Sequence, residues 1–183
     1  MDRALKLVID NTNRGGYKIY EYSPSVLRPF YKNYEKLTFQ RRVRFLLERI
    51  KGYKVYYLEV KNEIVAYSVV SRGGGRYSFA SPNDIVIGPY FVLEKFRGNH
   101  YSEMLVSELL GWEEIKYEYA YDWVKKDNVP SLRCSNRVGL FAVNTADVVG
   151  PFRKIQIRDD ASGEYYILRR DRFLNSEKEE KQN

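Results

Sequence analysis

Residues 85–110, IVIGPYFVLEKFRGNHYSEMLVSELL, combine an apolar strand, a short polar turn and an amphipathic helix. The strand part is rich in β-branched and aromatic residues. The helix part repeats apolar residues at helical spacing, at Tyr101, Met104, Leu105, Leu109 and Trp112. Between them, Arg97 to Ser102 forms a turn that opens the helix. Because the start of a helix has unpaired N–H groups and a partial positive charge, we expect this turn to bind phosphate.

Gly88-Pro89 lies in the middle of the strand expected over residues 83–93. The proline removes one donor from the hydrogen-bond ladder, which favours a bulge or a splay at this point. A splayed strand exposes backbone N–H and C=O groups, to which an extended ligand can add like another strand. An ordinary edge irregularity is the alternative. The nearby phosphate turn favours the ligand interpretation.

The length of 183 residues is typical of one domain, which we place at residues 1–174. Residues 175–183, NSEKEEKQN, carry charge without apolar side chains and predict a disordered tail. The single cysteine, Cys134, excludes an internal disulfide and is interpreted as a packing residue. No apolar run has the length of a membrane span and no signal peptide is recognisable, so we expect a cytoplasmic protein.

The formal net charge of +7 allows a nucleic acid, an anionic membrane or an anionic cofactor as partner. The basic residues are mixed with acids along the chain, and no zinc-finger or RNA-binding signature accompanies them. Solvated faces explain them better than a nucleic-acid surface. No metal site is expected.

The other elements follow from periodicity and turn residues. We expect strands at residues 5–9, 53–60, 63–71 and 117–124, a strand or loop at 17–22, and, after Val148-Val149, a final hairpin of strands at 152–158 and 164–170. Lys61-Asn62 between the strands at 53–60 and 63–71 is short enough for a hairpin. Residues 37–50 predict a helix that ends at Gly52, with Val43, Leu46, Leu47 and Ile50 on one apolar face and Glu48 elsewhere. A second, short helix begins near Pro130 and ends at Gly139.

Two segments resemble the GNAT superfamily of acetyl-CoA-dependent N-acetyltransferases. Residues 92–102, VLEKFRGNHYS, are similar to the family's Val, acidic and aromatic positions followed by Arg/Gln-x-x-Gly-x-Gly/Ala. Residues 128–140, NVPSLRCSNRVGL, resemble the family's Asn, a small residue three positions later, and a final Gly-Phe. The resemblance covers nearly all of residues 5–170. It implies an α/β (α+β) fold with a mixed, mostly antiparallel, twisted sheet that is flanked by helices and splayed at its centre.

The resemblance also implies where acetyl-CoA, the co-substrate, binds. Backbone groups around Val92 would pair with the pantetheine arm, the turn would hold the pyrophosphate, and Asn128 would contact the pantetheine region. The cofactor-binding residues implied are Phe91, Val92, Leu93, Arg97, Gly98, Asn99, His100, Tyr101, Ser102, Asn128 and Ser131. His100 and Ser102 stand where the family usually has glycine. His100, the only histidine, would then lie far from the acetyl group, which favours a ligand contact or a merely exposed position over a role as base.

The reaction implied is direct attack of a primary amine on the acetyl thioester. Amine attack needs a base, and Asp84 and Asp122 are candidates because they lie on the strands that flank the splay. The oxyanion needs an N–H from near Phe91 or Val92. Many family members use a tyrosine in the short helix to protonate the thiolate, and Ser135 occupies that position here. The general acid and base therefore stay open.

The acceptor amine also stays open among sugar nucleotides, small amines and peptides. It would be bound by residues 20–37 and the final pair of strands, where Tyr22, Arg28, Tyr31 and Tyr34 suit an anionic acceptor or simply pack. The alternative function is a non-catalytic module on the same scaffold that binds acyl-CoA or nucleic acid. The oligomeric state, a homodimer included, is not specified by the sequence.

Overall fold

The computed structural model describes residues 4–32, 38, 42, 45, 46, 48, 49, 52–150, 154–158 and 160–172. The chain divides into two compact units. The first comprises Met1–Ser71 and Gly88–Val106, and the second comprises Arg72–Ile87 and Ser107–Asn183. The tail predicted at residues 175–183 lies outside the described residues. Within the described part, hydrogen-bonded neighbours in the sheet come in the order β1-β2-β3-β4-β5-β6-β9-β7-β8, with the strands numbered along the chain.

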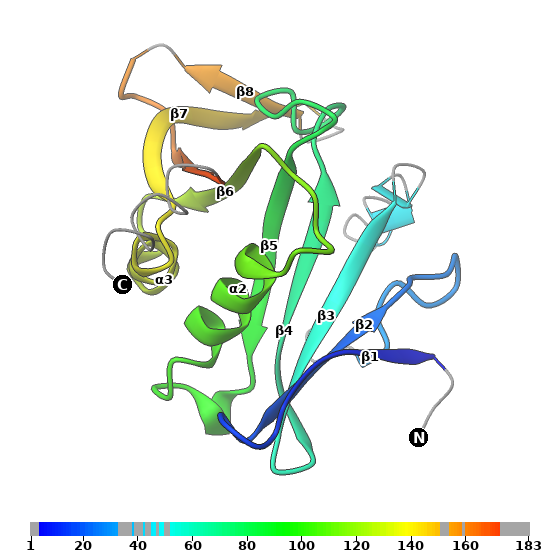
Figure 1. Ribbon diagram of the computed structural model, residues 1–183. Helices are drawn as coiled ribbons and strands as arrows, with labels where there is room; N and C mark the ends of the chain where they lie inside the picture. Colours follow the sequence, from blue (N-terminus) through cyan, green and yellow to red (C-terminus); the bar gives the residue numbers. More distant parts are fainter. Residues whose placement is uncertain are drawn as a thin grey trace. The chain divides into compact units, whose positions relative to one another are not determined.

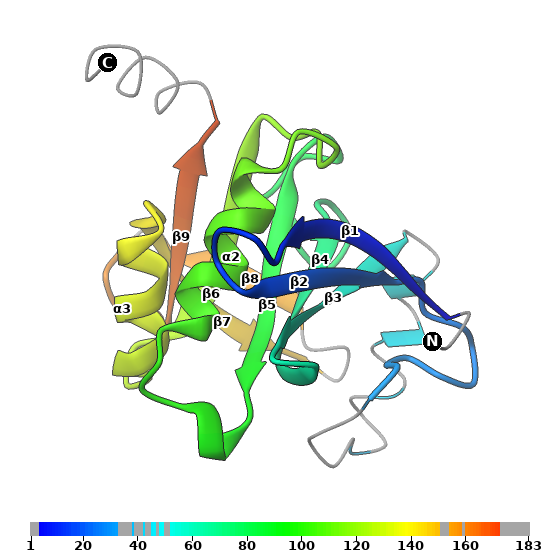
Figure 2. The same ribbon diagram turned by 60° about the horizontal axis from the view of Figure 1, so that its bottom comes forward.

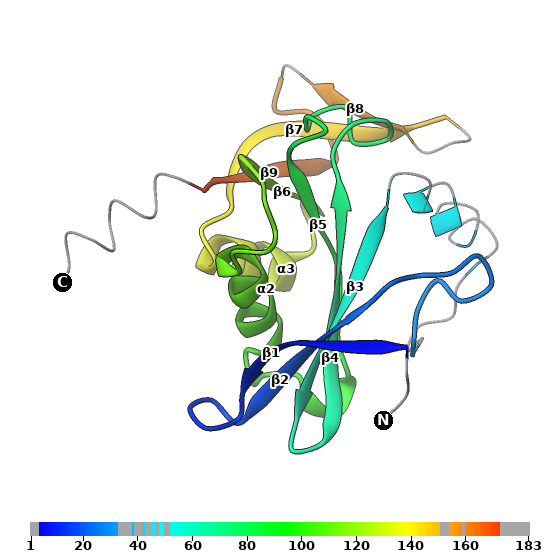
Figure 3. The same ribbon diagram turned by 45° about the vertical axis from the view of Figure 1, so that its right-hand side comes forward.

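The first unit is built on an antiparallel meander of four strands (Figure 1). Its strands are β1 (Leu5–Asn11), β2 (Tyr17–Tyr22), β3 (Tyr53–Val60) and β4 (Glu63–Arg72). The turn at residues 12–16 and the turn at residues 61–62 lie at the same end of the meander (Figure 3). Lys61 and Asn62 both have positive φ, as the two-residue hairpin predicted here requires.

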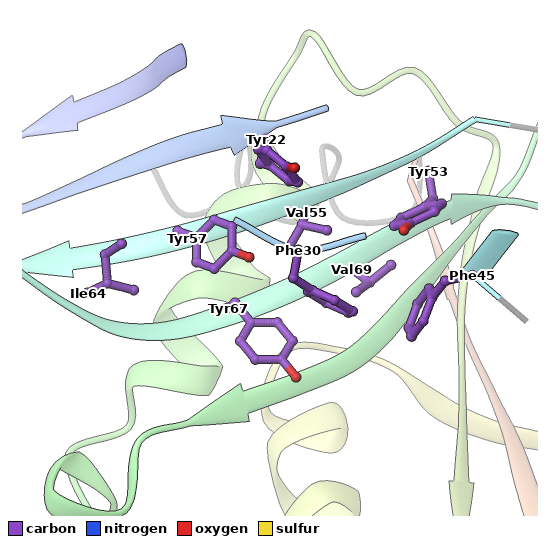
Figure 4. Packing of buried hydrophobic residues seen from close by; sticks show 9 residues of the cluster. All are labelled: Tyr22, Phe30, Phe45, Tyr53, Val55, Tyr57, Ile64, Tyr67 and Val69. Carbon is purple, nitrogen blue, oxygen red and sulfur yellow. The ribbon is translucent and has the colours of Figure 1, made fainter. Parts of the chain in front are cut away.

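Aromatic side chains from one face of this meander form its core (Figure 4). Tyr57 and Tyr67 are directly paired on β3 and β4, and both are buried. Phe30 contacts Tyr67 in an edge arrangement with ring centroids 5.3 Å apart. Such contacts stabilise beyond simple burial, so the many tyrosines of this sequence act first as core residues.

The hydroxyl groups of three core tyrosines reach the backbone of the loop at residues 23–32. The bonds run from Tyr22 to the carbonyl of Arg28 at 2.8 Å, from Tyr53 to that of Pro29 at 3.1 Å, and from Tyr57 to that of Lys32 at 3.2 Å. The oxygen of Tyr57 also accepts the N–H of Tyr31 at 3.0 Å. A loop packed on an apolar face needs such partners, because an unpaired buried peptide group is costly.

The helix predicted at residues 37–50 is helical at each of its described positions from Arg42 to Arg49, but its predicted face is wrong. Leu46 is 45% exposed, whereas Glu48 is buried. The described buried face runs instead through Phe45, whose ring meets Phe30 at 4.9 Å (Figure 4). An aromatic side chain that completes the core decides the orientation of the helix more strongly than the count of aliphatic residues. Val43, Leu47 and Ile50 lie outside the described residues.

Strand β5 (Ile85–Val92) belongs to both units. In the second unit its first part pairs in parallel with β6 (Tyr119–Lys125), through Ile85–Ala120 and Val86–Tyr121. The described register stops there, before Gly88-Pro89, where the sequence predicts a splay. The remaining registers within the units are antiparallel, so the predicted mixed, mostly antiparallel sheet is confirmed.

The second unit corrects the predicted final pair of strands. β8 (Lys154–Arg158) and β9 (Tyr165–Asp171) do not form a hairpin, because both pair with β7 (Phe141–Val149). The sequence indicated β7 only at its end, since Asn144, Thr145 and Asp147 interrupt its apolar pattern. β9 in turn pairs with β6 and lies beside α3 (Val129–Arg137) (Figure 2). Helix α2 (Tyr101–Gly111) follows β5, as predicted.

We predict that Tyr57→Phe lowers the free energy of unfolding by about 0.5–1.5 kcal/mol, because the change removes the part-buried hydrogen bonds between the Tyr57 hydroxyl and the backbone of Tyr31 and Lys32. Chemical denaturation followed by circular dichroism measures this loss. Tyr165→Phe is the control, since the Tyr165 hydroxyl has no hydrogen-bond partner among the described residues. Equal stability of the two variants would show that the loop does not depend on the Tyr57 hydroxyl.

Candidate active site

The turn between β5 and α2 contains two residues in the left-handed conformation. After the 3-10 helix η1 (Glu94–Phe96), Gly98 has φ +84° and His100 has φ +57°. Glycine adopts such angles without strain, whereas other residues rarely do. The glycine expected at position 100 from the family pattern is therefore explained by backbone geometry, and His100 adopts that geometry at a cost.

Helix α2 opens directly on this turn, with the Met104 N–H bonded to the His100 carbonyl at 3.0 Å. The first N–H groups of a helix have no acceptor within it, which leaves those of Tyr101 and Ser102 directed toward the turn. Asn99 holds the turn from inside, since its Nδ2 donates to the Phe96 carbonyl at 3.1 Å. These groups together form a concentration of backbone donors suited to an anion.

The charged side chains of the turn are engaged with their neighbours. The Arg97 guanidinium lies over the ring of Phe91, 5.7 Å from its centroid, and its Nε donates to the Val92 carbonyl at 3.4 Å. His100 Nδ1 lies 3.0 Å from Oε2 of Glu103, the acid in the first turn of α2. The negative charge of the Glu103 carboxylate would repel an anionic ligand bound at the helix start. The His100 imidazole lies against this carboxylate.

The end of β5 offers part of its backbone for pairing. The Leu93 N–H donates to the Val65 carbonyl of β4 at 3.0 Å, so this donor is already used. Phe91 and Val92 are half-buried, and the Phe91 ring stacks on Tyr67 at 5.8 Å. Backbone recognition of an extended ligand therefore falls to Phe91 and Val92 rather than to Leu93.

In the second unit, Asp84 is surrounded by backbone donors. It is buried, with Oδ2 accepting the Ser81 N–H at 2.8 Å and Oδ1 accepting the Tyr119 N–H at 3.0 Å. These bonds connect the loop before β5 to the start of β6. Both carboxylate oxygens thus accept backbone N–H groups, and neither meets a hydroxyl that could relay a proton among the described residues, which does not favour Asp84 as the base.

Asp122 and Ser135 form a buried hydrogen bond between β6 and α3. Ser135 Oγ lies 2.8 Å from Asp122 Oδ2 and 3.0 Å from the carbonyl of Ser131. A hydroxyl has one proton, so it donates to one of these acceptors at a time. Asp122 Oδ1 accepts the Trp123 N–H at 2.7 Å. This is the arrangement of a carboxylate that can take a proton through a serine hydroxyl.

Asn128 is the N-cap of α3, with its side chain accepting the Ser131 N–H at 3.4 Å. Its amide Nδ2 has no hydrogen-bond acceptor within the described part of the chain, and both residues lie at the accessible start of the helix. The structure therefore brings Asn128, Ser131, Ser135 and Asp122 together in the second unit. The predicted residues from Phe91 to Ser102 lie in the first unit, and Asp84 has its own separate network.

The sequence did not single out Tyr121, the neighbour of Asp122 on β6. Burial raises the pKa of the Tyr121 phenol, while a hydrogen bond from Arg169 lowers it in part. The net direction is upward, so Tyr121 keeps its proton at neutral pH. Its place in an aromatic strand indicated only packing, and it does pack in a core cluster with Ile155 and Ala146.

No group of three or more His, Cys, Asp or Glu side chains among the described residues is placed to hold a metal ion. Among the same residues, no helix is both long enough and apolar enough to cross a membrane.

Comparison with solved structures identifies the fold. No protein-family model and no curated protein sequence matches the chain. Solved structures do match. Ard1 from Thermoplasma volcanium has a TM-score of 0.54 at 18% identity, over 85% of this chain and 97% of that one. The GNAT domain of S. lividans PAT has a TM-score of 0.55 at 12% identity, over 91% of this chain and 96% of that one.

A third match is the aminoglycoside acetyltransferase AAC(6')-Ib in complex with coenzyme A and kanamycin. Its TM-score is 0.54 at 12% identity, over 73% of this chain and 74% of that one. The chain thus has the fold of the GNAT acetyltransferases, as its two sequence segments predicted.

We predict that His100→Val is less stable than His100→Gly by about 1–2 kcal/mol, because a β-branched residue is strained at this positive φ. Both changes remove the same contact with Glu103, so the difference isolates the backbone term. Denaturant titration measures it. The opposite order, with glycine the less stable, is expected only where φ is negative, since glycine then loses more entropy on folding.

Proposed function

We propose that the chain is an N-acetyltransferase that transfers an acetyl group from acetyl-CoA to a primary amine. The observation that carries the proposal is the β5–turn–α2 segment within a GNAT fold. Its left-handed Gly98 and His100 open the helix start toward an anion, and the strand before it offers backbone at Phe91 and Val92. Fold alone does not define activity, so the proposal rests on this local geometry.

In the proposed complex the pyrophosphate is held by the N–H groups from Gly98 to Ser102. The pantetheine arm pairs with the backbone of Val92. The Phe91 or Val92 N–H stabilises the oxyanion. Arg97 adds positive charge at the turn, and its contact with Phe91 is exposed enough to exchange for a phosphate.

We predict that Ser102→Asp weakens acetyl-CoA binding on the order of tenfold or more, because it places a negative charge where the pyrophosphate is proposed. The same change leaves the free protein as stable or stabilises it by about 0.3–1 kcal/mol, since an acid is favourable at a helix start. Calorimetric titration and thermal melting measure the two effects.

The control for this prediction is Ser107→Asp, an exposed position further along α2. It adds the same charge to the same helix away from the turn. An equal loss of affinity in both variants would place the pyrophosphate elsewhere.

The proposed proton path uses Asp122 and Ser135. An alkylamine has a pKa of about 10, so at neutral pH its ammonium form first loses one proton to water, and the neutral amine then loses a second proton in the course of attack. Ser135 accepts that proton as its own moves to Asp122. When the thiolate departs, the carboxylic acid returns its proton to Ser135, which gives one to sulfur. The amine loses one proton and the thiol gains one, which restores the pair.

We predict that Ser135→Ala and Asp122→Asn each lower kcat by roughly 100-fold or more, while acetyl-CoA still raises the melting temperature. Release of free thiol in the presence of an amine panel measures the rate. Asp84→Asn is the comparison, because we expect it to lose stability and to keep its rate while folded. A Ser135→Ala protein that is less stable yet fully active would show that the hydrogen bond between Asp122 and Ser135 is structural and takes no part in proton transfer.

One observation favours the alternative function, a non-catalytic acyl-CoA-binding module. Ser135 is 1% exposed, and it stands where many GNAT enzymes have a tyrosine. A melting shift with acetyl-CoA but no thiol release with any amine would select this alternative. No shift at concentrations well above micromolar would exclude the proposed cofactor, and salt-sensitive binding of mixed RNA or DNA would favour a nucleic-acid module.

The acceptor remains a primary amine of unspecified class. Tyr22 and Tyr31, which the sequence offered as lining residues, pack against each other with ring centroids 6.1 Å apart. The Tyr22 hydroxyl bonds to the carbonyl of Arg28. Tyr34 lies outside the described residues. Of the predicted acceptor side chains, Arg28 is the one exposed in the described part.

A further inference from the structure

A small cavity lies in the first unit, between the loop at residues 23–32 and the helical residues that follow it. Its volume is about 60 Å³. Apolar atoms of Val26, Leu27, Phe45 and Leu46 line it. This is less than the roughly 150 Å³ of an engineered apolar cavity that holds benzene, so it suits the tip of one aliphatic side chain.

The floor of the cavity is packed against aromatic rings, whereas its rim is exposed. Phe45 packs against Phe30 at 4.9 Å and Tyr53 at 5.4 Å (Figure 4). In contrast, Leu27 is 90% exposed and Val26 is 57% exposed. A contiguous apolar rim around a formed cavity is the pattern of a surface that another molecule covers.

Two arginines, Arg42 and Arg49, line the same cavity and are exposed. Among the described residues, no hydrogen bond or ion pair engages either guanidinium. Glu48, the acid described on this helical segment, is buried and does not line the cavity. The local field is therefore positive, and guanidinium groups bind carboxylates in a two-pronged geometry.

We propose that this cavity docks an acidic peptide segment of a partner protein, with one aliphatic side chain in the cavity and carboxylates on Arg42 and Arg49. A small carboxylate would fill the cavity but leave Val26 and Leu27 in water, whereas a peptide covers them. A buried aliphatic anchor with arginines beside it is the usual composition of an interface centre. The proposal goes beyond the proposed acetyl transfer and does not depend on it.

The test is fluorescence anisotropy with a labelled peptide that has a central leucine between aspartates and glutamates. We expect Arg42→Gln with Arg49→Gln to weaken binding at least on the order of tenfold, because each charge-assisted bond is lost. Leu27→Ser should weaken it several-fold, and its high exposure means that folding is unaffected. Affinity should fall as salt rises.

The control variant is Arg14→Gln with Lys18→Gln, which removes two positive charges from the β1–β2 hairpin of the same unit. It should bind the peptide as the unchanged protein does. A peptide with serine in place of leucine, and one with amides in place of acids, should both bind weakly. The acetyl-CoA melting shift, measured on every variant, should not change, which separates this proposal from the proposed function.

Several results would overturn the proposal. These are no binding of the peptide at millimolar concentration, an equal loss in the control variant, and equal binding of the serine peptide. Sedimentation that shows a dimer dissolved by Leu27→Ser would assign the surface to a second copy of the chain. Binding to anionic vesicles, but not to the peptide, would assign it to a membrane surface.

Discussion

The packing of the loop at residues 23–32 depends on the hydroxyl groups of three tyrosines, Tyr22 on β2 and Tyr53 and Tyr57 on β3. Each ring lies in the core of the first unit, and each hydroxyl donates a part-buried hydrogen bond to a backbone carbonyl of the loop. This arrangement also positions Phe45 of the helical segment, because the Phe45 ring packs on Phe30, which belongs to the loop. The cavity beneath Val26 and Leu27 therefore exists because tyrosines, rather than phenylalanines, occupy β2 and β3.

The sequence predicted the local parts of this protein well. The turn from Arg97 to Ser102 was identified because a strand, a polar break and a helical repeat follow each other within 26 residues. The Lys61-Asn62 hairpin was similarly local. The errors concern nonlocal choices. Glu48 was assigned to the solvent face because periodicity does not show that Phe45 completes a core made by β3 and the preceding loop. β7 was missed because its pairing with both β8 and β9, and not its own composition, makes it a strand.

The candidate site shows the same limit. A sequence shows that Asp84 and Asp122 both lie on strands, but not what meets their oxygens. In the structure the Asp84 oxygens accept the N–H groups of Ser81 and Tyr119, whereas one oxygen of Asp122 lies 2.8 Å from the hydroxyl of Ser135. The two carboxylates are similar in burial and differ in their partners. Likewise, the sequence shows that histidine replaces glycine at position 100 but does not show the backbone conformation there. The structure shows that His100 has a positive φ, which strains a residue other than glycine.

The short helix that holds Ser135 also holds Cys134, the only cysteine of the chain, and that side chain is 3% exposed. A chromogenic thiol reagent therefore meets almost no reactive sulfur on the folded protein, because a buried thiol reacts slowly. Denaturation releases one equivalent per chain. The same absorbance reading thus reports unfolded chains at one thiol per chain, whereas thiol released by the proposed reaction would be read on the native protein with almost no contribution from Cys134.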